Sequence, residues 1–145
     1  MALNICDKLR AGVTTATAEA TEAIATEFAE SIPPDVTLAL HGNLGVGKTT
    51  FVRGLARGFG IKGPVTSPTF SIYSIHRGQQ LLVHLDAYRL ESAQQIDDLL
   101  LEDFLTTPYC LAIEWPEKIS AWIPANALHL DLGIAPDESH TIRLR

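Results

Sequence analysis

Hydrophobic residues in the first part of the chain recur with a helical period that one strand-like run interrupts. Hydrophobic side chains at every fourth position from Ala20 to Phe28 predict an amphipathic helix, and Thr17 is placed to cap its first turn. The run VTLAL at 36–40 is hydrophobic at nearly every position, which is typical of a buried strand. A second helical pattern covers 50–59. The order helix, strand, helix predicts the beginning of an α/β fold.

Strand patterns dominate the rest of the chain. A loose alternation at 3–9 predicts an edge strand, while the spacing at 92–105 predicts a helix and 116–120 one helical turn. Clearer strand patterns occur at 69–76, 81–85, 109–113, 128–132 and 141–144. Turns at 77–80 and 136–139 predict two hairpins, which require antiparallel neighbours. We therefore expect one domain over the whole chain, residues 1 to 145, with a single central mixed β-sheet flanked by helices.

A glycine-rich segment carries the clearest chemical signal. Residues 42–49 match the phosphate-loop pattern G-x-x-x-x-G-K-[ST], between a predicted strand and a predicted helix. Glycines let backbone N–H groups approach phosphate oxygens, and the N-terminus of the helix favours the same negative charge. Lys48 would reach the outer phosphates, and the Thr49 hydroxyl would bind Mg²⁺. The sequence thus predicts a P-loop NTPase fold that binds ATP or ADP with Mg²⁺ at Gly42, Asn43, Leu44, Gly45, Val46, Gly47, Lys48, Thr49 and Thr50.

Two acidic residues are candidates for the metal side of this site. Asp86 and Glu114 each follow a hydrophobic strand pattern directly, where the carboxyl ends of neighbouring strands would meet. Their spacing does not decide which acid holds the metal and which orients water. Arg89 is the arginine expected nearest to the site. His84 lies within a hydrophobic strand, where a histidine is more often a hydrogen-bonded core residue than a metal ligand.

Composition narrows the function classes. The chain has 145 residues and a formal net charge of −6, which argues against a protein that grips RNA or DNA alone, because phosphates require a basic face. Cys6 and Cys110 show no metal-binding spacing. The sequence contains neither a secretion signal pattern nor a run of membrane-spanning length, so we expect a cytoplasmic protein without membrane association. No N-K-x-D or D-x-x-G motif follows the loop, which argues against a GTPase.

Four segments, in this order and spacing, resemble one family. They are GNLGVGKTTFVRGLARGFG, VTSPTFSIYSIH, HLDAYRL and AIEWPEKI, and the resemblance extends from about Thr17 to Pro124. The family is TsaE (also called YjeE), small bacterial P-loop ATPases required for threonylcarbamoyladenosine in tRNA. The chain departs from the usual pattern at Asn43, where the family usually has aspartate, and at Val46, where alanine is common. Both are variable positions of the loop pattern.

The resemblance implies a mixed sheet flanked by helices and an ATPase that acts on the heterodimer of TsaD and TsaB. That heterodimer would present the tRNA, whose adenosine 3′ of the anticodon is modified. The metal ligands of the family correspond to Thr49 and Glu114, and its conserved aspartate corresponds to Asp86. Its conserved loop threonine corresponds to Thr69, and the tryptophan that follows the acid is Trp115 in this chain. We expect Lys48, Asp86 and Glu114 to be the catalytic residues.

The hypothesis that results is slow ATP hydrolysis that partner proteins stimulate. Lys48 would hold the β- and γ-phosphates, Asp86 would position water, and the segment Thr66–Phe70 would sense the γ-phosphate. Two alternatives remain open at this point. One is a kinase that transfers phosphate to a small molecule, and the other is a binding module that nucleotide switches with negligible catalysis.

Overall fold

The chain folds around one mixed β-sheet. The computed structural model describes residues 4–43, 45–65 and 72–145. The strands are β1 (Val13–Thr15), β2 (Val36–His41), β3 (Tyr73–Arg77), β4 (Leu81–Asp86), β5 (Tyr109–Glu114), β6 (Leu128–Ile134) and β7 (His140–Leu144). Their spatial order is β1-β7-β6-β2-β5-β4-β3. The inner pairs β6–β2, β2–β5 and β5–β4 are parallel, and the outer pairs are antiparallel, which confirms the predicted mixed sheet and both hairpins.

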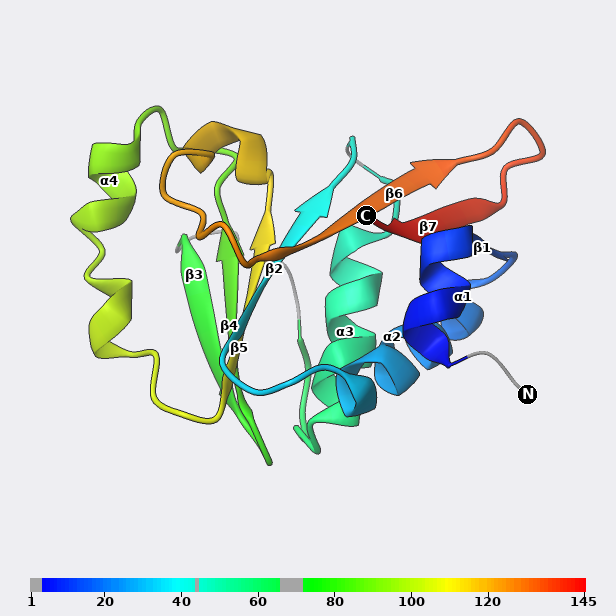
Figure 1. Cartoon of the computed structure of the whole chain (residues 1–145), viewed down its shortest axis with the longest axis horizontal. Coiled ribbons are helices and arrows are strands. Elements are labelled where there is room, and N and C mark those ends of the chain that lie inside the picture. The colour runs from blue at the N-terminus through cyan, green and yellow to red at the C-terminus, as the bar shows by residue number, and fades with distance from the viewer. Residues whose placement is uncertain (1–3, 44, 66–71) are drawn as a thin grey trace.

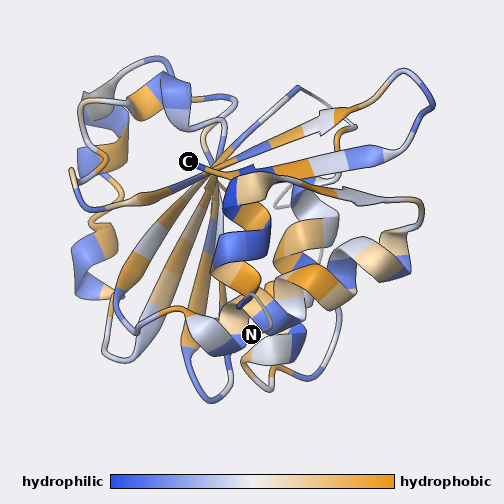
Figure 2. Cartoon of the chain, turned by 45° about the vertical axis from the view of Figure 1, so that its right-hand side comes forward, coloured by the Kyte–Doolittle hydropathy of each residue, from blue (hydrophilic) through white to orange (hydrophobic). Residues whose placement is uncertain are grey.

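Helices cover both faces of this sheet (Figure 1). They are α1 (Ile5–Ala11), α2 (Ala18–Ser31), α3 (Lys48–Gly58), α4 (Ala93–Asp97) and the 3₁₀ turns η1 (Leu101–Asp103) and η2 (Pro116–Ile119). One hydrophobic core lies between the sheet and α1, α2 and α3; a second lies between the sheet and α4, η1 and η2. Figure 2 shows that hydrophobic residues follow the central strands. Alternate residues of β4 and β5 therefore face different cores.

Close packing of α2 against α3 fixes the helix that follows the phosphate loop. A Cβ atom on Gly54 would lie 2.4 Å from the Glu22 carbonyl oxygen, and one on Gly58 would lie 2.6 Å from the Ala29 Cβ. The Thr26 hydroxyl donates a hydrogen bond to the Gly54 carbonyl at 2.9 Å. Glycines four residues apart on one face thus let the two backbones approach, and α3 is held along most of its length.

The prediction of an edge strand at 3–9 is wrong for the described residues, because the helix α1 begins at Ile5. The Asn4 side chain accepts a hydrogen bond from the Asp7 amide at 2.8 Å and caps the first turn. Ile5 and Leu9, four residues apart, are both buried. A loose alternation over seven residues fits both periods, and the cap and the buried pair favour the helix. The Thr17 cap of α2 is confirmed.

The helix expected at 92–105 is only partly present. α4 ends at Asp97, and Leu100 adopts a left-handed conformation with φ 54° before η1 begins. Ser92 precedes α4 without making a side-chain cap. Leu100 is 59% exposed, whereas Leu101 is fully buried. The left-handed residue turns the chain so that Leu101 reaches the core, and the burial of Leu101 outweighs the continuation of the helix.

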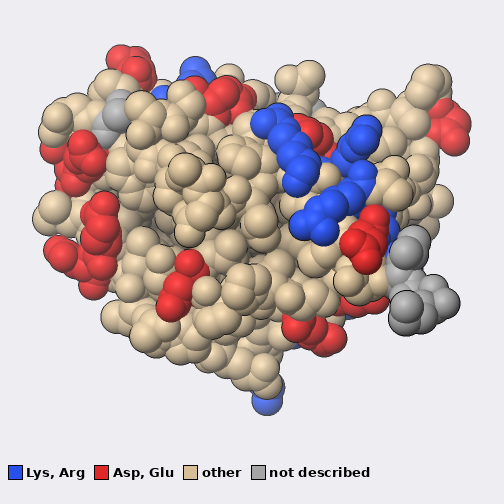
Figure 3. Space-filling view, in the orientation of Figure 1, with Lys and Arg blue, Asp and Glu red and all other residues tan. Residues whose placement is uncertain are grey.

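Charges of both signs lie on the molecular surface. In the view of Figure 3, acidic side chains are spread over the surface, and most visible Lys and Arg side chains form one group with acidic side chains beside it. Arg145 makes two hydrogen bonds of 2.8 Å to Asp131. None of the helices in the described ranges is long and hydrophobic enough to cross a membrane.

Candidate nucleotide-binding site

The loop between β2 and α3 has the backbone that a phosphate cradle requires. Gly42 has φ 145°, and a Cβ atom there would lie 2.5 Å from the Leu132 carbonyl oxygen. Gly47 is left-handed with φ 98° and precedes the first residue of α3, whose N-terminus has no side-chain cap. The amide groups of the first helical turn are therefore open to a bound anion, which both their dipoles and their missing partners favour.

Lys48 is held at the start of α3 by two contacts. Its Nζ donates a hydrogen bond to the Gly42 carbonyl at 2.6 Å and lies 3.7 Å from the centre of the Trp115 ring. The residue is only 4% exposed. Burial lowers the pKa of Lys48 from its ordinary value, and the carboxylates of Glu114, Glu117 and Asp86 counteract this shift. The ammonium thus lies in a site that disfavours an isolated charge, which increases its attraction to an anion.

Asp86 and Glu114 lie side by side at the carboxyl ends of β4 and β5, where the strand register pairs them. The Thr49 hydroxyl donates a hydrogen bond to Glu114 Oε2 at 3.2 Å. Asp86 Oδ1 instead accepts a hydrogen bond from the Tyr88 amide at 3.0 Å. The geometry thus distinguishes the two acids where their spacing did not: Glu114 contacts the loop, and Asp86 contacts its own following turn.

The loop, both acids and the tryptophan border one cavity of about 350 Å³. Its lining comprises Gly45, Gly47, Lys48, Thr49, Thr50, Arg53, Asp86, Glu114, Trp115 and His140. Asn43 is exposed, and the Val46 side chain is buried in the core, so Val46 can offer only its backbone to a ligand. The expected contacts of Leu44 and of the sensor segment at 66–70, which includes Thr69, lie outside the described residues.

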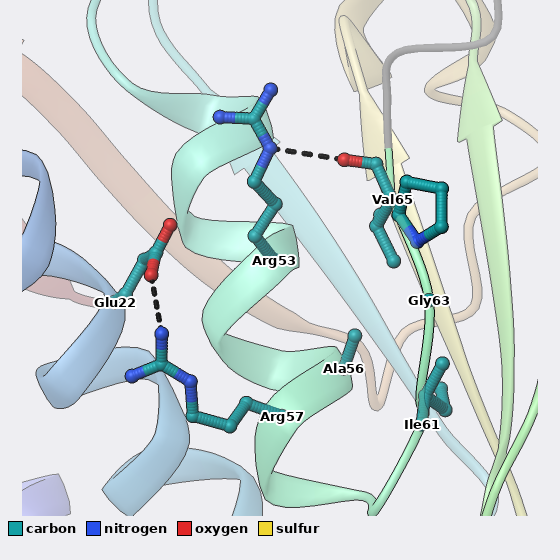
Figure 4. Close-up of a pocket in the computed structure, with 8 residues that line it drawn as sticks. Glu22, Arg53, Ala56, Arg57, Ile61, Gly63 and Val65 are labelled. Atoms are coloured by element: carbon teal, nitrogen blue, oxygen red, sulfur yellow. Dashed lines mark hydrogen bonds and ion pairs between the residues drawn. The ribbon is translucent and has the colours of Figure 1, made fainter.

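Arg53 is an arginine at this cavity that sequence reasoning missed. The expected residue, Arg89, is not part of the cavity lining. Arg53 lies four residues after Thr49, hence on the same face of α3, and this spacing could have identified it. Its Nε donates a hydrogen bond to the Val65 carbonyl at 2.9 Å (Figure 4). Arg53 also lines a neighbouring cavity of about 450 Å³, so its side chain lies between the two cavities.

His140 and His84 support the site from two strands. His140 Nδ1, on β7, lies 3.0 Å from the Val46 carbonyl oxygen. The two residues are 94 positions apart in the sequence, so no short motif could predict this contact. His84 Nε2, on β4, lies 2.5 Å from Glu114 Oε2, and the side chain is fully buried. The interpretation of His84 as a hydrogen-bonded core residue is therefore confirmed, and its partner is a candidate site residue.

The donor set fits Mg²⁺ better than a transition metal. Within the described ranges, no three His, Cys, Asp or Glu residues form a group that could hold a metal ion. Mg²⁺ prefers oxygen ligands and is commonly held by one or two carboxylates while water and phosphates complete its shell. The neighbouring oxygens of Thr49 and Glu114 match this requirement.

Comparisons with known proteins agree with the geometry. The chain matches the family model described as "Threonylcarbamoyl adenosine biosynthesis protein TsaE" over residues 15–142, a range that includes the phosphate loop, both acids and His140. The chain belongs to the TsaE family. The TsaE match begins before α2 and ends within β7, so it covers nearly the whole sheet rather than the loop alone.

Individual TsaE-family relatives give the same result. A protein of Bacillus subtilis (strain 168), "tRNA threonylcarbamoyladenosine biosynthesis protein TsaE", is 37% identical over 125 residues, which cover 86% of this chain and 78% of the relative. A Mycobacterium bovis protein of the same name is 33% identical and covers 88% of this chain and 83% of its own. The crystal structure of Bacillus subtilis YdiB superposes with a TM-score of 0.77 at 33% identity, covering 92% of this chain and 82% of that one. The chain therefore has a P-loop NTPase fold.

Proposed function

We propose that this TsaE-family chain binds ATP with Mg²⁺ at the 42–50 loop and hydrolyses it in the service of tRNA threonylcarbamoyladenosine biosynthesis. One observation carries the proposal: a single cavity brings together a glycine loop, an uncapped helix N-terminus, a buried lysine, and a hydroxyl in contact with a carboxylate. Each of these features favours a bound polyphosphate.

The residues divide the work on the triphosphate by their positions. The loop amides bind phosphate oxygens. Lys48 gives up its hydrogen bond to the Gly42 carbonyl and binds the outer phosphates, because their negative charge attracts the ammonium more strongly. Thr49 and Glu114 would hold Mg²⁺, which when bound neutralises charge on the phosphates. Asp86, which lines the same cavity, would orient the attacking water.

The partners in this proposal are proteins of the TsaD and TsaB type. The net charge of −6 and the mixed charges in Figure 3 support a chain that reaches tRNA through partners rather than by its own surface. The proposed site of action is the cytoplasm. A slow reaction in the free chain and a faster one in the complex follow if partners contribute charge to the transition state.

A binding and turnover experiment tests this function. Calorimetry with ATP, in Mg²⁺ and in EDTA, should show binding that Mg²⁺ strengthens. Phosphate release should be slow alone and rise when a purified TsaD–TsaB heterodimer is added. Absence of ATP binding would refute the nucleotide site, and phosphate transfer to a small metabolite instead of water would favour the kinase. Complex formation that needs ATP while no phosphate is ever released would favour a nucleotide-switched binding module.

A further inference from the structure

His84 occupies a position that core packing alone does not explain. Its side chain is fully buried on β4, on the same face of the sheet as Leu82, which belongs to the core under α3. Nδ1 is buried and has no hydrogen-bond partner in the part of the chain that the structure describes. A hydrophobic residue would fill this volume without leaving an unpaired nitrogen. The reason for a histidine here must therefore lie in the hydrogen bond that its other nitrogen, Nε2, makes.

The hydrogen-bond pattern defines where the proton of His84 lies. A carboxylate only accepts, so Nε2 must donate to Glu114 Oε2 across their 2.5 Å separation. Among the described residues Nδ1 has no acceptor, so a buried N–H there would be left without a partner in that part of the chain. The arrangement therefore places the ring proton on Nε2 and the lone pair on Nδ1.

Among the described residues, two hydrogen bonds reach the Glu114 carboxylate, and both converge on one oxygen. Oε2 accepts from His84 Nε2 and from the Thr49 hydroxyl, which come from β4 and α3 respectively. Neither bond uses Oε1. The carboxylate is thus held by two hydrogen bonds from different elements. The hydrogen bond from His84 can persist even if the Thr49 hydroxyl turns toward another ligand.

We propose that His84 is a positioning residue that orients Glu114 for the metal ion of the nucleotide site. The proposal rests on the proposed function, since it assigns His84 a role at the same Mg²⁺ site. Loss of a side chain that hydrogen-bonds a metal ligand typically lowers metal affinity or activity by about 10- to 100-fold. His84 acts through Glu114 and need not touch the nucleotide.

Three substitutions separate positioning from filling of the core. In His84→Gln the side-chain amide nitrogen can replace Nε2 as donor to Glu114. In His84→Asn the amide is of the same polarity but too short to reach, and in His84→Leu the donor is absent. Calorimetry with ADP, in Mg²⁺ and in EDTA, measures how much Mg²⁺ strengthens binding in each variant, and thermal unfolding measures stability.

We expect the variants to differ in how much Mg²⁺ strengthens ADP binding and not in their ADP affinity without Mg²⁺. Affinity for ADP in EDTA should agree within about twofold among all variants, while the gain from Mg²⁺ falls about 10- to 100-fold in the Asn and Leu variants and is largely retained in His84→Gln. An undiminished Mg²⁺ gain in folded His84→Asn and His84→Leu would overturn the proposal, as would an equal loss in EDTA. If the wild-type chain itself shows no Mg²⁺-dependent binding, the proposed function fails first.

A second readout needs neither nucleotide nor a folded variant. Long-range ¹H–¹⁵N spectra of the wild-type chain report which ring nitrogen of each histidine carries the proton, and through-bond correlations assign the His84 signals. The proton should be found on Nε2. A proton on Nδ1 would mean that His84 does not donate to Glu114, and the proposal would be wrong whatever the nucleotide data show.

Discussion

The two faces of the sheet are built in different ways. On one face, α2 and α3 have 14 and 11 residues and pack through glycines with their backbones close together. On the other face, a helix of five residues and two 3₁₀ turns cover the core. Each 3₁₀ turn is preceded by a non-glycine residue with positive φ, Leu100 before η1 and Trp115 before η2. We call these two faces the regular face and the irregular face, respectively. The regular face holds the phosphate loop, whereas Trp115, at the start of η2 on the irregular face, lines the cavity. Close helix packing thus supports the loop that carries Lys48, and a residue with positive φ supplies the aromatic ring that contacts the Lys48 ammonium.

The largest expected effect is on nucleotide binding through the regular face. Lys48→Ala removes the ammonium at the start of α3, and ATP affinity should fall at least about 100-fold, or about 2.7 kcal/mol. Calorimetry with MgATP measures it. Lys118→Ala, on η2 of the irregular face, is the control and should change affinity by less than about twofold. Unchanged ATP affinity in Lys48→Ala would show that the lysine does not bind phosphate.

Gly54→Ala should destabilise the chain by about 1–3 kcal/mol, although alanine favours helices, because the added methyl would overlap the Glu22 carbonyl oxygen. Urea unfolding measures the change. Ala23→Gly, on the exposed side of α2, reports the helix propensity alone, at about 1 kcal/mol. A Gly54→Ala variant as stable as the wild type would mean that α2 and α3 are less closely packed than described.

Arg53→Ala should weaken ATP binding about tenfold, equivalent to about 1.4 kcal/mol, because Arg53 is a cation in the lining of the cavity that Lys48 also lines. Arg57→Ala is the matched control, since Arg57 lies one turn further along α3 and pairs with Glu22 at 2.7 Å instead (Figure 4). Titration with MgATP distinguishes the two. Equal losses in both variants would indicate a general effect of charge rather than a contact at the site.

The smallest expected effect is a gain on the irregular face. Leu100→Gly should stabilise the chain by about 0.5–1 kcal/mol, because glycine adopts the left-handed conformation without the cost that leucine has there. Leu100→Ala removes the same exposed side chain but keeps Cβ, so it should give no comparable gain. Both are compared by urea unfolding. A loss of stability in Leu100→Gly would mean that the Leu100 side chain contributes packing that outweighs its strain.

The sequence predicted the regular face better than the irregular one, and the reason is the range of the interactions. The loop motif, the Thr17 cap and the strand β2 are local patterns, visible within a few residues. The break at Leu100 depends on whether Leu101 gains more by burial than the helix gains by continuing, and such a balance is tertiary. The alternation at 3–9 fits both a strand and a helix, and in the sequence only the cap at Asn4 favours the helix that begins at Ile5.

The same reasoning applies to the site. Asp86 and Glu114 were found because each follows a strand, and strand ends in a parallel sheet converge. His84 and His140 act through contacts with residues far away in the chain, and their sequence neighbours carry no signal of these partners. Helix periodicity from Thr49 predicts Arg53 at the site, whereas the arginine expected there was Arg89, three residues after Asp86.

The order of the strands has a consequence for synthesis. β2 leads into the loop, yet both of its neighbours in the sheet, β5 and β6, and the His140 contact with the loop come much later in the chain. While the ribosome is still translating the segment before β5, the loop motif has already been made but has no sheet to hold it. The nascent chain can complete its phosphate cradle only after β6 and β7 have emerged, so nucleotide capture should come late in folding, after these long-range pairings have formed.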